Sequence, residues 1–382
     1  MLDDFGEFGQ DNFTGNLSMV LLQLIKPGLW ACFLSLVITP IMILIYKKMG
    51  WLDDPKKQKH PKVIHKYPVP RGGGVVIFLA ILLTSLTHLP VDKHLVGILL
   101  GAGVLTLVGV WDDVKNLNPY WRLILGFLAA GIVVAVGIGV PYISNPFKVG
   151  AVINLSQPQI PIYLFGKLRT IWIWADLMAL IWIVGAMNFV NWSKGLDGQL
   201  PGIVVVAATV IGVLSLRFID DVTQWPVIVL AFILAGTYLG FLAWNFYPQK
   251  IMPGYGGGVL AGYFLAVLAI LSGAKMATAI LVLGVPMMDA IYTIIRRVVQ
   301  GKSPVWGDRG HLHHKLMDLG WGKRRIAVFY WLVSAILGFL ALRLNSQLKL
   351  YTIVLLGVVI GGALLWLNTA TYFLKKPDRG SG

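Results

Sequence analysis

The chain has 382 residues, of which 57% are hydrophobic and only 13% are charged, and its mean hydropathy is +0.75. This composition excludes a soluble globular protein, because so much apolar surface must face lipid. A net charge of +15 would suggest nucleic acid as the partner of a soluble protein, but in a membrane protein the distribution of basic residues matters more than their sum, so no nucleic-acid partner is expected.

Eleven apolar segments have the length of a transmembrane helix, and they predict one all-α polytopic membrane domain over residues 1–382. The predicted spans are 28–46, 73–90, 95–111, 120–140, 170–190, 201–216, 226–244, 258–272, 276–294, 326–343 and 350–372. Between the fourth and fifth spans, the segment 141–168 alternates apolar and polar residues around prolines, which favours an external turn or small β-hairpin.

Basic residues are unevenly distributed between the two sides of this predicted bundle. With the acidic segment 1–18 outside, the inner segments are 47–72, 112–122, 191–200, 245–257, 295–325 and 373–382. They carry 23 of the 32 Lys and Arg residues, so the positive-inside rule predicts an external amino terminus and a cytoplasmic carboxyl terminus. The polar motifs described next fall on the inner side, where they can meet in one cytoplasmic cleft.

The pair Asp112 and Asp113 ends the third predicted span. Two adjacent carboxylates at a membrane surface can bind Mg²⁺ through their oxygens, or one can act as a base that the other orients. The alternative is a solvated helix end. Arg122 begins the fourth span nearby, where it can bind a lipid phosphate or simply extend to the interface.

More polar residues lie where the fifth span meets the inner side. Asn188 and Asn191 precede Gly195-Leu196-Asp197-Gly198, whose glycines allow a ligand to approach the backbone closely. The amide and carboxylate side chains can bind a base, a ribose or a metal. The alternative is an ordinary loop of turn-forming residues.

The ninth predicted span contains Asp289, and a carboxylate inside the bilayer is costly unless it faces protein or water. The next inner loop contains Asp308-Arg309-Gly310-His311-Leu312-His313-His314-Lys315. Its arginine and three histidines can donate hydrogen bonds to anionic oxygens and exchange protons near pH 7. A zinc site is the rival interpretation, but no cysteine and no second histidine cluster accompanies this motif.

The first inner loop contains His65 and Lys66 and ends with Pro68-Val69-Pro70-Arg71 before three glycines. A glycine-rich helix start can expose backbone N–H groups to phosphate, whereas basic residues alone can face an anionic leaflet. Carboxylates for a divalent cation and basic residues for phosphates together predict that a nucleotide diphosphate meets a lipid phosphate at the membrane surface. Phosphoryl transfer is the chemistry that this combination favours.

These motifs resemble those of the polyprenyl-phosphate N-acetylhexosamine-1-phosphate transferase family. The similar pieces are His65 with Pro68-Val69-Pro70-Arg71, Trp111-Asp112-Asp113, Asn188, Asn191 with Gly195-Leu196-Asp197-Gly198, Asn245 with Pro248, Pro286 with Asp289, and His311-Leu312-His313-His314. Each piece is weak alone, but their order along nearly the whole chain is specific.

The resemblance implies a multi-pass enzyme of the cell membrane that transfers a sugar phosphate from a UDP-N-acetylhexosamine to a polyprenyl phosphate, uses Mg²⁺ and releases UMP. The Pro70-Arg71 pair and the His-Leu-His-His sequence favour the GlcNAc-type branch. The phospho-MurNAc-pentapeptide branch is the alternative. A homodimer is compatible with the resemblance.

The resemblance also implies roles for individual residues. Those implied in catalysis are Asp112, Asp113, His311, His313 and His314. Those implied in substrate binding are His65, Lys66, Arg71, Arg122, Asn188, Asn191, Lys194, Asp197, Asn245 and Arg309. Those implied in metal binding are Asp113, Asn191 and Asp289. The chain departs from the family pattern where Lys194 and Tyr255 replace aspartates, so the expected Mg²⁺ site loses two carboxylates, and the Lys194 ammonium can replace part of the cation's charge.

Two other classes of protein fit parts of the sequence. A membrane transporter would also have many spans and an intramembrane carboxylate, but it does not need histidines and aspartates clustered in its inner loops. A non-catalytic relative would bind a nucleotide or lipid without turnover. Release of UMP from a UDP-sugar distinguishes an enzyme from both.

Overall fold

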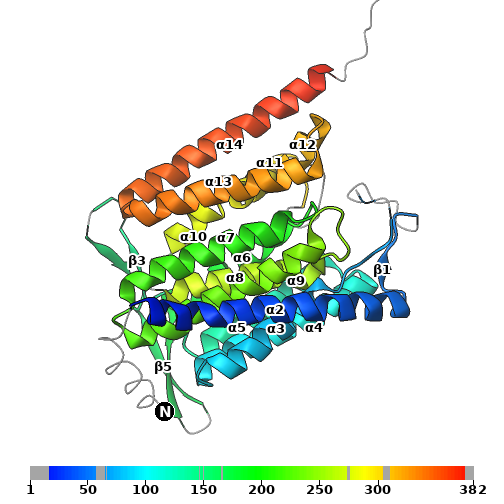
Figure 1. Cartoon of the computed structure of the whole chain (residues 1–382). Coiled ribbons are helices and arrows are strands. Elements are labelled where there is room, and N and C mark those ends of the chain that lie inside the picture. The colour runs from blue at the N-terminus through cyan, green and yellow to red at the C-terminus, as the bar shows by residue number, and fades with distance from the viewer. Residues whose placement is uncertain are drawn as a thin grey trace, which may run out of the picture.

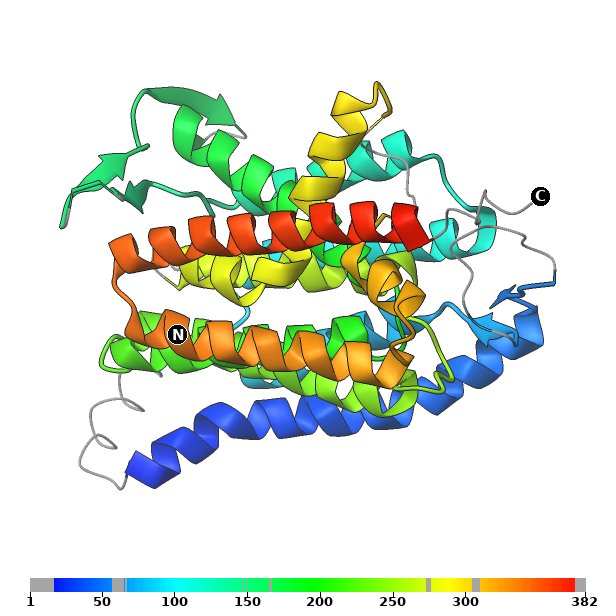
Figure 2. The same cartoon turned by 90° about the horizontal axis from the view of Figure 1, so that it is seen from above.

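The structure, a computed structural model, describes residues 17–56, 65, 67–145, 147–148, 150–164, 167–272, 276–303 and 310–374. Most of these residues are helical, and the long helices run side by side as a bundle (Figures 1 and 2). The small strands lie at the two ends of the bundle, with β1 at one end and β3 and β5 at the other (Figure 1).

The helices follow the predicted spans in position, except that the first begins at Leu17 rather than at residue 28. They are α2 (Leu17–Met49), α3 (Gly73–His88), α4 (Lys93–Lys115), α5 (Pro119–Ala135), α6 (Ile173–Trp192), α7 (Gln199–Ser215), α8 (Trp225–Asn245), α9 (Gly254–Leu271), α10 (Met276–Val282), α11 (Gly284–Val299), α12 (Leu312–Asp318), α13 (Lys323–Arg343) and α14 (Ser346–Leu374). Two 3-10 turns, Leu216–Phe218 and Val222–Gln224, connect α7 to α8.

Within the described part of the chain, eight helices are long and apolar enough to cross a membrane. Helices α10 and α11 meet at a bend of 84°. If this bent pair counts as one span, the number rises to nine. The remaining two predicted spans correspond to the shorter apolar helices α3 and α5. The chain is therefore a polytopic helical membrane protein.

Three span boundaries differ from their prediction for local reasons. The fourth span ends at Ala135 rather than at residue 140, because Gly137 adopts a left-handed backbone with φ +98°. The fifth begins at Ile173, because residues 167–172 pair as a strand. The ninth is broken near Leu283, although its apolar sequence continues without interruption.

The predicted hairpin region 141–168 contains two antiparallel hairpins. Strand β3 (Tyr142–Ser144) pairs with β4 (Val152–Asn154), and Ile143 lies opposite Ile153. Strand β5 (Gln159–Leu164) pairs with β6 (Lys167–Trp172), and Ile160 lies opposite Ile171. A third pair, β1 (Leu52–Asp53) with β2 (Val69–Pro70), was not predicted and lies at the opposite end of the bundle (Figure 1).

Helix α9 is the centre of the bundle, and nearly all of its residues are buried. Glycines allow its backbone to approach those of α3 and α4 closely. A Cβ atom on Gly74 of α3 or on Gly109 of α4 would clash with the backbone at Gly256 of α9. The glycines at the start of α3 have the same use. Gly73 donates its N–H to the carbonyl of Met252 at 3.0 Å, so the glycine-rich helix start packs against the chain before α9, and this N–H does not face a phosphate.

Candidate functional site

The carboxylate of Asp112 is fixed at the end of α4. Its side chain is 3% exposed, accepts a hydrogen bond from the N–H of Leu117 at 3.0 Å, and pairs with the Arg122 guanidinium at 3.4 Å. Asn116 ends the helix in a left-handed conformation, which turns the chain towards α5 and brings Arg122 back to Asp112. The structure thus joins two of the predicted site residues.

Asp113 points from α4 to the first turn of α9. One carboxylate oxygen accepts a hydrogen bond from the N–H of Tyr255 at 3.0 Å, which places a negative charge at a helix amino terminus. Gly254, the residue before Tyr255, has φ +68°. A Cβ atom at Gly254 would collide with the Asp113 carboxylate and the carbonyl of Arg71. Only glycine fits at this contact.

Lys194 lies between α6 and α7, and its ammonium reaches the same turn of α9. It donates a hydrogen bond to the carbonyl of Gly254 at 3.0 Å and lies 5.5 Å from the ring centroid of Tyr255. The Arg122 guanidinium lies 5.3 Å from the same ring. The two residues that depart from the family pattern are therefore in direct contact.

Burial lowers the pKa of the Lys194 ammonium to about 7, although the nearby Asp113 and Asp112 carboxylates oppose the change. Arg71 and Arg122 lower the pKa further through charge repulsion. Lys194 can therefore gain or lose its charge near neutral pH.

Arg71 completes this group of charges. It donates a hydrogen bond to the side chain of Asn116 at 3.0 Å and lies 3.8 Å from the buried carboxylate of Asp53. A ring nitrogen of His65 lies 3.1 Å from the Asp53 carbonyl, so His65 contacts the loop that positions Arg71. We call Arg71, Asp112, Asp113, Arg122 and Lys194 the aspartate cluster. Lys66 lies outside the described residues.

The loop between α6 and α7 is held by internal hydrogen bonds. The Asn245 side chain accepts from the N–H of Gly198 at 3.0 Å and donates to the carbonyl of Ile251 at 2.8 Å. Asp197 is 1% exposed, accepts from the N–H of Gln249 at 3.3 Å and lies 3.5 Å from the Lys323 ammonium. These contacts position the loop that carries Lys194.

The two asparagines at the end of α6 differ in their contacts. The Asn188 side chain donates to the carbonyl of Val184 within its own helix. The side-chain oxygen of Asn191 is buried against Gly258, with no hydrogen-bond partner among the described residues. Asn191 thus presents an unsatisfied acceptor beside α9.

A second group surrounds Asp289 on α11. Its two oxygens bind the ring of His311 at 2.9 Å and the N–H of Leu312 at 2.9 Å. The rings of His311 and His313 stack with an interplanar angle of 5°, and His314 packs beside His313. We call Asp289, His311, His313 and His314 the histidine cluster. Arg309 lies outside the described residues.

The histidine cluster is buried. Burial lowers the pKa of the His313 imidazole well below its usual value, and the neighbouring histidines lower it further, so this ring is uncharged at pH 7. Its Nε2 atom lies against Gly195 and has no hydrogen-bond partner within the described part of the chain. His311 lies 5.8 Å from the ring of Trp192. The loop after α6 therefore contacts both clusters.

Two residues at this site were not predicted. Asp53 supports both His65 and Arg71, and Lys323 pairs with Asp197. Asp53 has no distinguishing sequence signal, because it is one of two adjacent acidic residues in a basic loop. Lys323 begins α13, where a basic residue is also typical of a membrane interface.

The fold and the polar site define a class: an integral membrane protein with buried carboxylates, basic residues and histidines gathered at one end of a helix bundle. Residues 95–273 match the model of glycosyl transferase family 4. This match confirms the predicted resemblance.

The curated relatives are similar over most of their length. The chain is 29% identical to the probable undecaprenyl-phosphate N-acetylglucosaminyl 1-phosphate transferase of Bacillus subtilis, over 81% of this chain and 82% of that one. It is 27% identical to the decaprenyl-phosphate N-acetylglucosaminephosphotransferase of Mycobacterium leprae, over 86% and 85%. It is 25% identical to the phospho-N-acetylmuramoyl-pentapeptide-transferase of Moorella thermoacetica, over 85% and 99%.

Proposed function

We propose that this protein transfers N-acetylhexosamine-1-phosphate, with GlcNAc favoured, from a UDP-sugar to a polyprenyl phosphate and releases UMP. The observation that carries the proposal is the aspartate cluster, in which three basic side chains surround the carboxylates of Asp112 and Asp113 where α4 meets α9. The names of the relatives from B. subtilis and M. leprae support the sugar and the lipid acceptor.

In the proposed reaction, an oxygen of the lipid phosphate attacks the β-phosphorus of the UDP-sugar. The new phosphorus–oxygen bond forms as the bond to the bridging oxygen breaks, and that oxygen leaves with its electron pair on UMP. Asp113 accepts the proton of the attacking phosphate, and Asp112 orients Arg122 beside it. Binding two anions side by side among basic groups supplies proximity and neutralises charge.

The histidine cluster has a different proposed role. Asp289 fixes the orientation of His311, as a carboxylate commonly does for a catalytic or ligand-binding imidazole. His311 and the neutral His313 then bind the diphosphate or the sugar through ring nitrogens. Because Asp289 uses both oxygens for His311 and Leu312, it acts here as a positioning group.

Members of the family generally depend on a divalent metal. The described residues contain no group of three or more His, Cys, Asp or Glu side chains that could hold an ion without oxygens from the substrate phosphates. Asp113 also lies in the field of the buried Lys194 ammonium, which disfavours a second cation. The proposed chemistry therefore uses Lys194, Arg71 and Arg122 as its positive charges.

We also propose that the protein has eleven spans and that both clusters face the cytoplasm. The charge count of 23 inner basic residues among 32 supports this orientation. We expect cysteine at exposed Lys302 to be labelled only from the cytoplasm, and cysteine at exposed Tyr163 only from outside, in a background without the single native cysteine, Cys32. Labelling of both positions from the same side would contradict the orientation.

The reaction is tested by incubating the purified protein with polyprenyl phosphate and radiolabelled UDP-sugars. We expect UDP-GlcNAc to give a labelled lipid and UMP. A product only with UDP-MurNAc-pentapeptide would support the other branch, which the M. thermoacetica relative represents. Tight UDP-GlcNAc binding without a product would identify a non-catalytic protein.

A further inference from the structure

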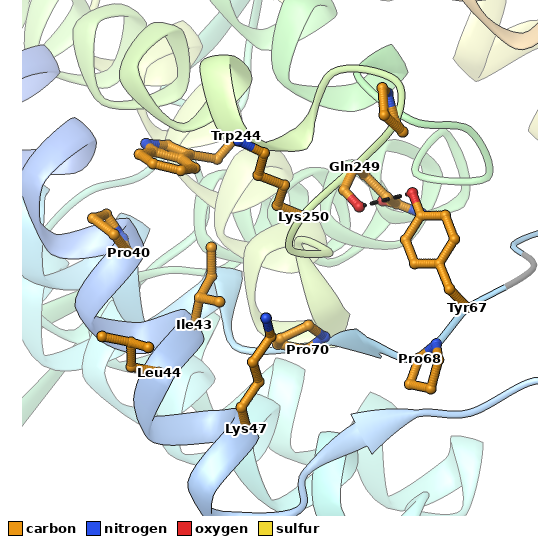
Figure 3. A pocket seen from close by; sticks show the side chains of 11 residues that line it. Pro40, Ile43, Leu44, Lys47, Tyr67, Pro68, Pro70, Trp244, Gln249 and Lys250 are labelled. Carbon is orange, nitrogen blue, oxygen red and sulfur yellow. Dashed lines mark hydrogen bonds between the residues drawn. The ribbon is translucent and has the colours of Figure 1, made fainter.

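A groove of about 510 Å³ lies outside both clusters, between α2 and the segment that joins α8 to α9 (Figure 3). Its α2 wall consists of Pro40, Ile43, Leu44 and Lys47, which share one face because they recur at helical spacing. Its other walls are Tyr67, Pro68, Pro70, Trp244, Pro248, Gln249 and Lys250. The groove is thus mostly apolar and contains two lysines.

The groove is built on fixed contacts. The indole N–H of Trp244 donates to the carbonyl of Leu36 at 3.2 Å, which ties α8 to α2. The Lys250 ammonium lies 4.9 Å from the Trp244 ring centroid, and the Tyr67 hydroxyl donates to the carbonyl of Gln249 at 3.0 Å (Figure 3). These contacts connect the walls of the groove to one another.

The charges of the groove have one sign. Lys47 and Lys250 are both exposed, and none of the lining residues is acidic. In Figure 3 the Lys47 side chain extends from α2 towards Pro70, across the groove. Two ammonium groups beside an apolar groove match the chemistry of a phosphate attached to hydrocarbon chains.

The groove opens onto the lipid-facing side of α2. Phe33 is 52% exposed, Ile41 51% and Leu44 69%, which is the exposure expected of apolar residues that face acyl chains. Lys47 lies in the last turn of the same helix, next to β1, where a headgroup meets the membrane surface. The groove therefore lies at the correct depth for a bilayer lipid.

We propose that this groove binds an anionic phospholipid of the surrounding bilayer, with its phosphate between Lys47 and Lys250 and its acyl chains along Ile43 and Trp244. This lipid is distinct from the lipid substrate, because no residue that lines the groove belongs to either cluster. On the inner wall of the groove, the N–H of Gln249 donates to Asp197 at 3.3 Å. The bound phospholipid stabilises that wall. The proposal does not depend on the transferase reaction.

The test measures lipid retention. The full-length protein is incorporated into phosphatidylcholine discs that contain phosphatidylglycerol, transferred to neutral detergent, and its bound lipid is quantified by mass spectrometry. We expect the wild type to retain phosphatidylglycerol, and the double variant Lys47→Gln and Lys250→Gln to bind it roughly 30-fold more weakly, as for the loss of two lysines near an anionic headgroup.

Two further variants distinguish lipid binding in the groove from a general effect of surface charge. The matched control, Lys48→Gln with Lys302→Gln, removes the same charge from exposed lysines outside the groove and should retain lipid like the wild type. Ile43→Trp fills the groove without changing charge and should reduce retention. Equal retention by the groove variant and the wild type, equal loss in the control, or retention of polyprenyl phosphate alone would overturn the proposal.

Discussion

The aspartate cluster and the histidine cluster lie on two sides of one loop but are built differently. In the aspartate cluster, each carboxylate has its own donor. Asp112 pairs with the Arg122 guanidinium, and Asp113 accepts a hydrogen bond from the N–H of Tyr255. In the histidine cluster, one carboxylate, Asp289, orients a stack of imidazoles of which His313 is neutral.

This difference indicates that the two clusters have different roles in binding and reaction. Basic groups around carboxylates attract anions and lower the cost of bringing two phosphates together. Oriented neutral rings donate and accept hydrogen bonds without adding charge. We therefore expect substitutions in the aspartate cluster to affect the binding and reaction of both phosphates, and substitutions in the histidine cluster to affect the binding and turnover of the UDP-sugar.

The largest expected effect is that of Asp113→Asn. The amide keeps the size of the side chain but cannot accept the proton of the lipid phosphate, so we expect turnover to fall by at least ~100-fold with an unchanged melting temperature. Steady-state kinetics and a thermal melt measure both. Asp220→Asn, at an exposed position outside both clusters, is the control. Turnover near that of the wild type would remove Asp113 from the mechanism.

The histidine cluster is tested by His311→Ala and Asp289→Asn. We expect His311→Ala to lower turnover by about 100-fold and Asp289→Asn by a somewhat smaller factor, because the ring then loses its orienting partner. If Asp289 acts through His311, the double variant should be no slower than His311→Ala alone. Additive losses would mean that Asp289 has an independent role, such as metal binding.

Lys194→Ala should weaken UDP-sugar binding by about 1.5–3 kcal/mol, because the diphosphate loses a charge-assisted partner in a partly desolvated cleft. Calorimetry measures this, with the exposed Lys48→Ala as control. Replacing both Lys194 and Tyr255 with Asp should make turnover more dependent on Mg²⁺. Identical Mg²⁺ titrations for the wild type, Lys194→Ala and this double variant would show that Lys194 does not replace a cation.

The smallest expected effect is a pH dependence of UDP-sugar affinity. Because burial lowers the pKa of Lys194 to about 7, the ammonium that attracts the diphosphate is lost as pH rises above 7. Affinity should therefore fall with increasing pH, by at most about tenfold per unit. His313 stays neutral over this range and adds no slope. Lys194→Arg should make the dependence weaker, and an equal slope in that variant would assign it to another group.

The sequence predicted those parts of the site whose residues lie close together along the chain. Asp112 and Arg122 are separated by one helix end, so their contact follows from local structure. Hydropathy likewise located the spans, because lipid exposure depends on composition. The alternation of apolar and polar residues around prolines located the hairpin region.

Contacts between distant segments could not be predicted. Lys194 and Gly254 meet because α6 and α9 pack together, and nothing near Lys194 in the sequence indicates this partner. The break between α10 and α11 was missed because apolar residues continue through it, and hydropathy does not show where a helix changes direction. Asp289 therefore looked like a carboxylate within a continuous span, whereas it follows a bend and orients His311.

The most direct test of the proposed function uses UDP-GlcNAc labelled with ³²P in the phosphate attached to the sugar. The purified protein is incubated with this substrate and polyprenyl phosphate, and the lipid and nucleotide products are separated. Transfer of a sugar phosphate predicts that the label enters the lipid fraction and that unlabelled UMP is released. Labelled UDP with an unlabelled glycolipid would show that only the sugar moves, and would contradict the assignment of both clusters to phosphoryl transfer.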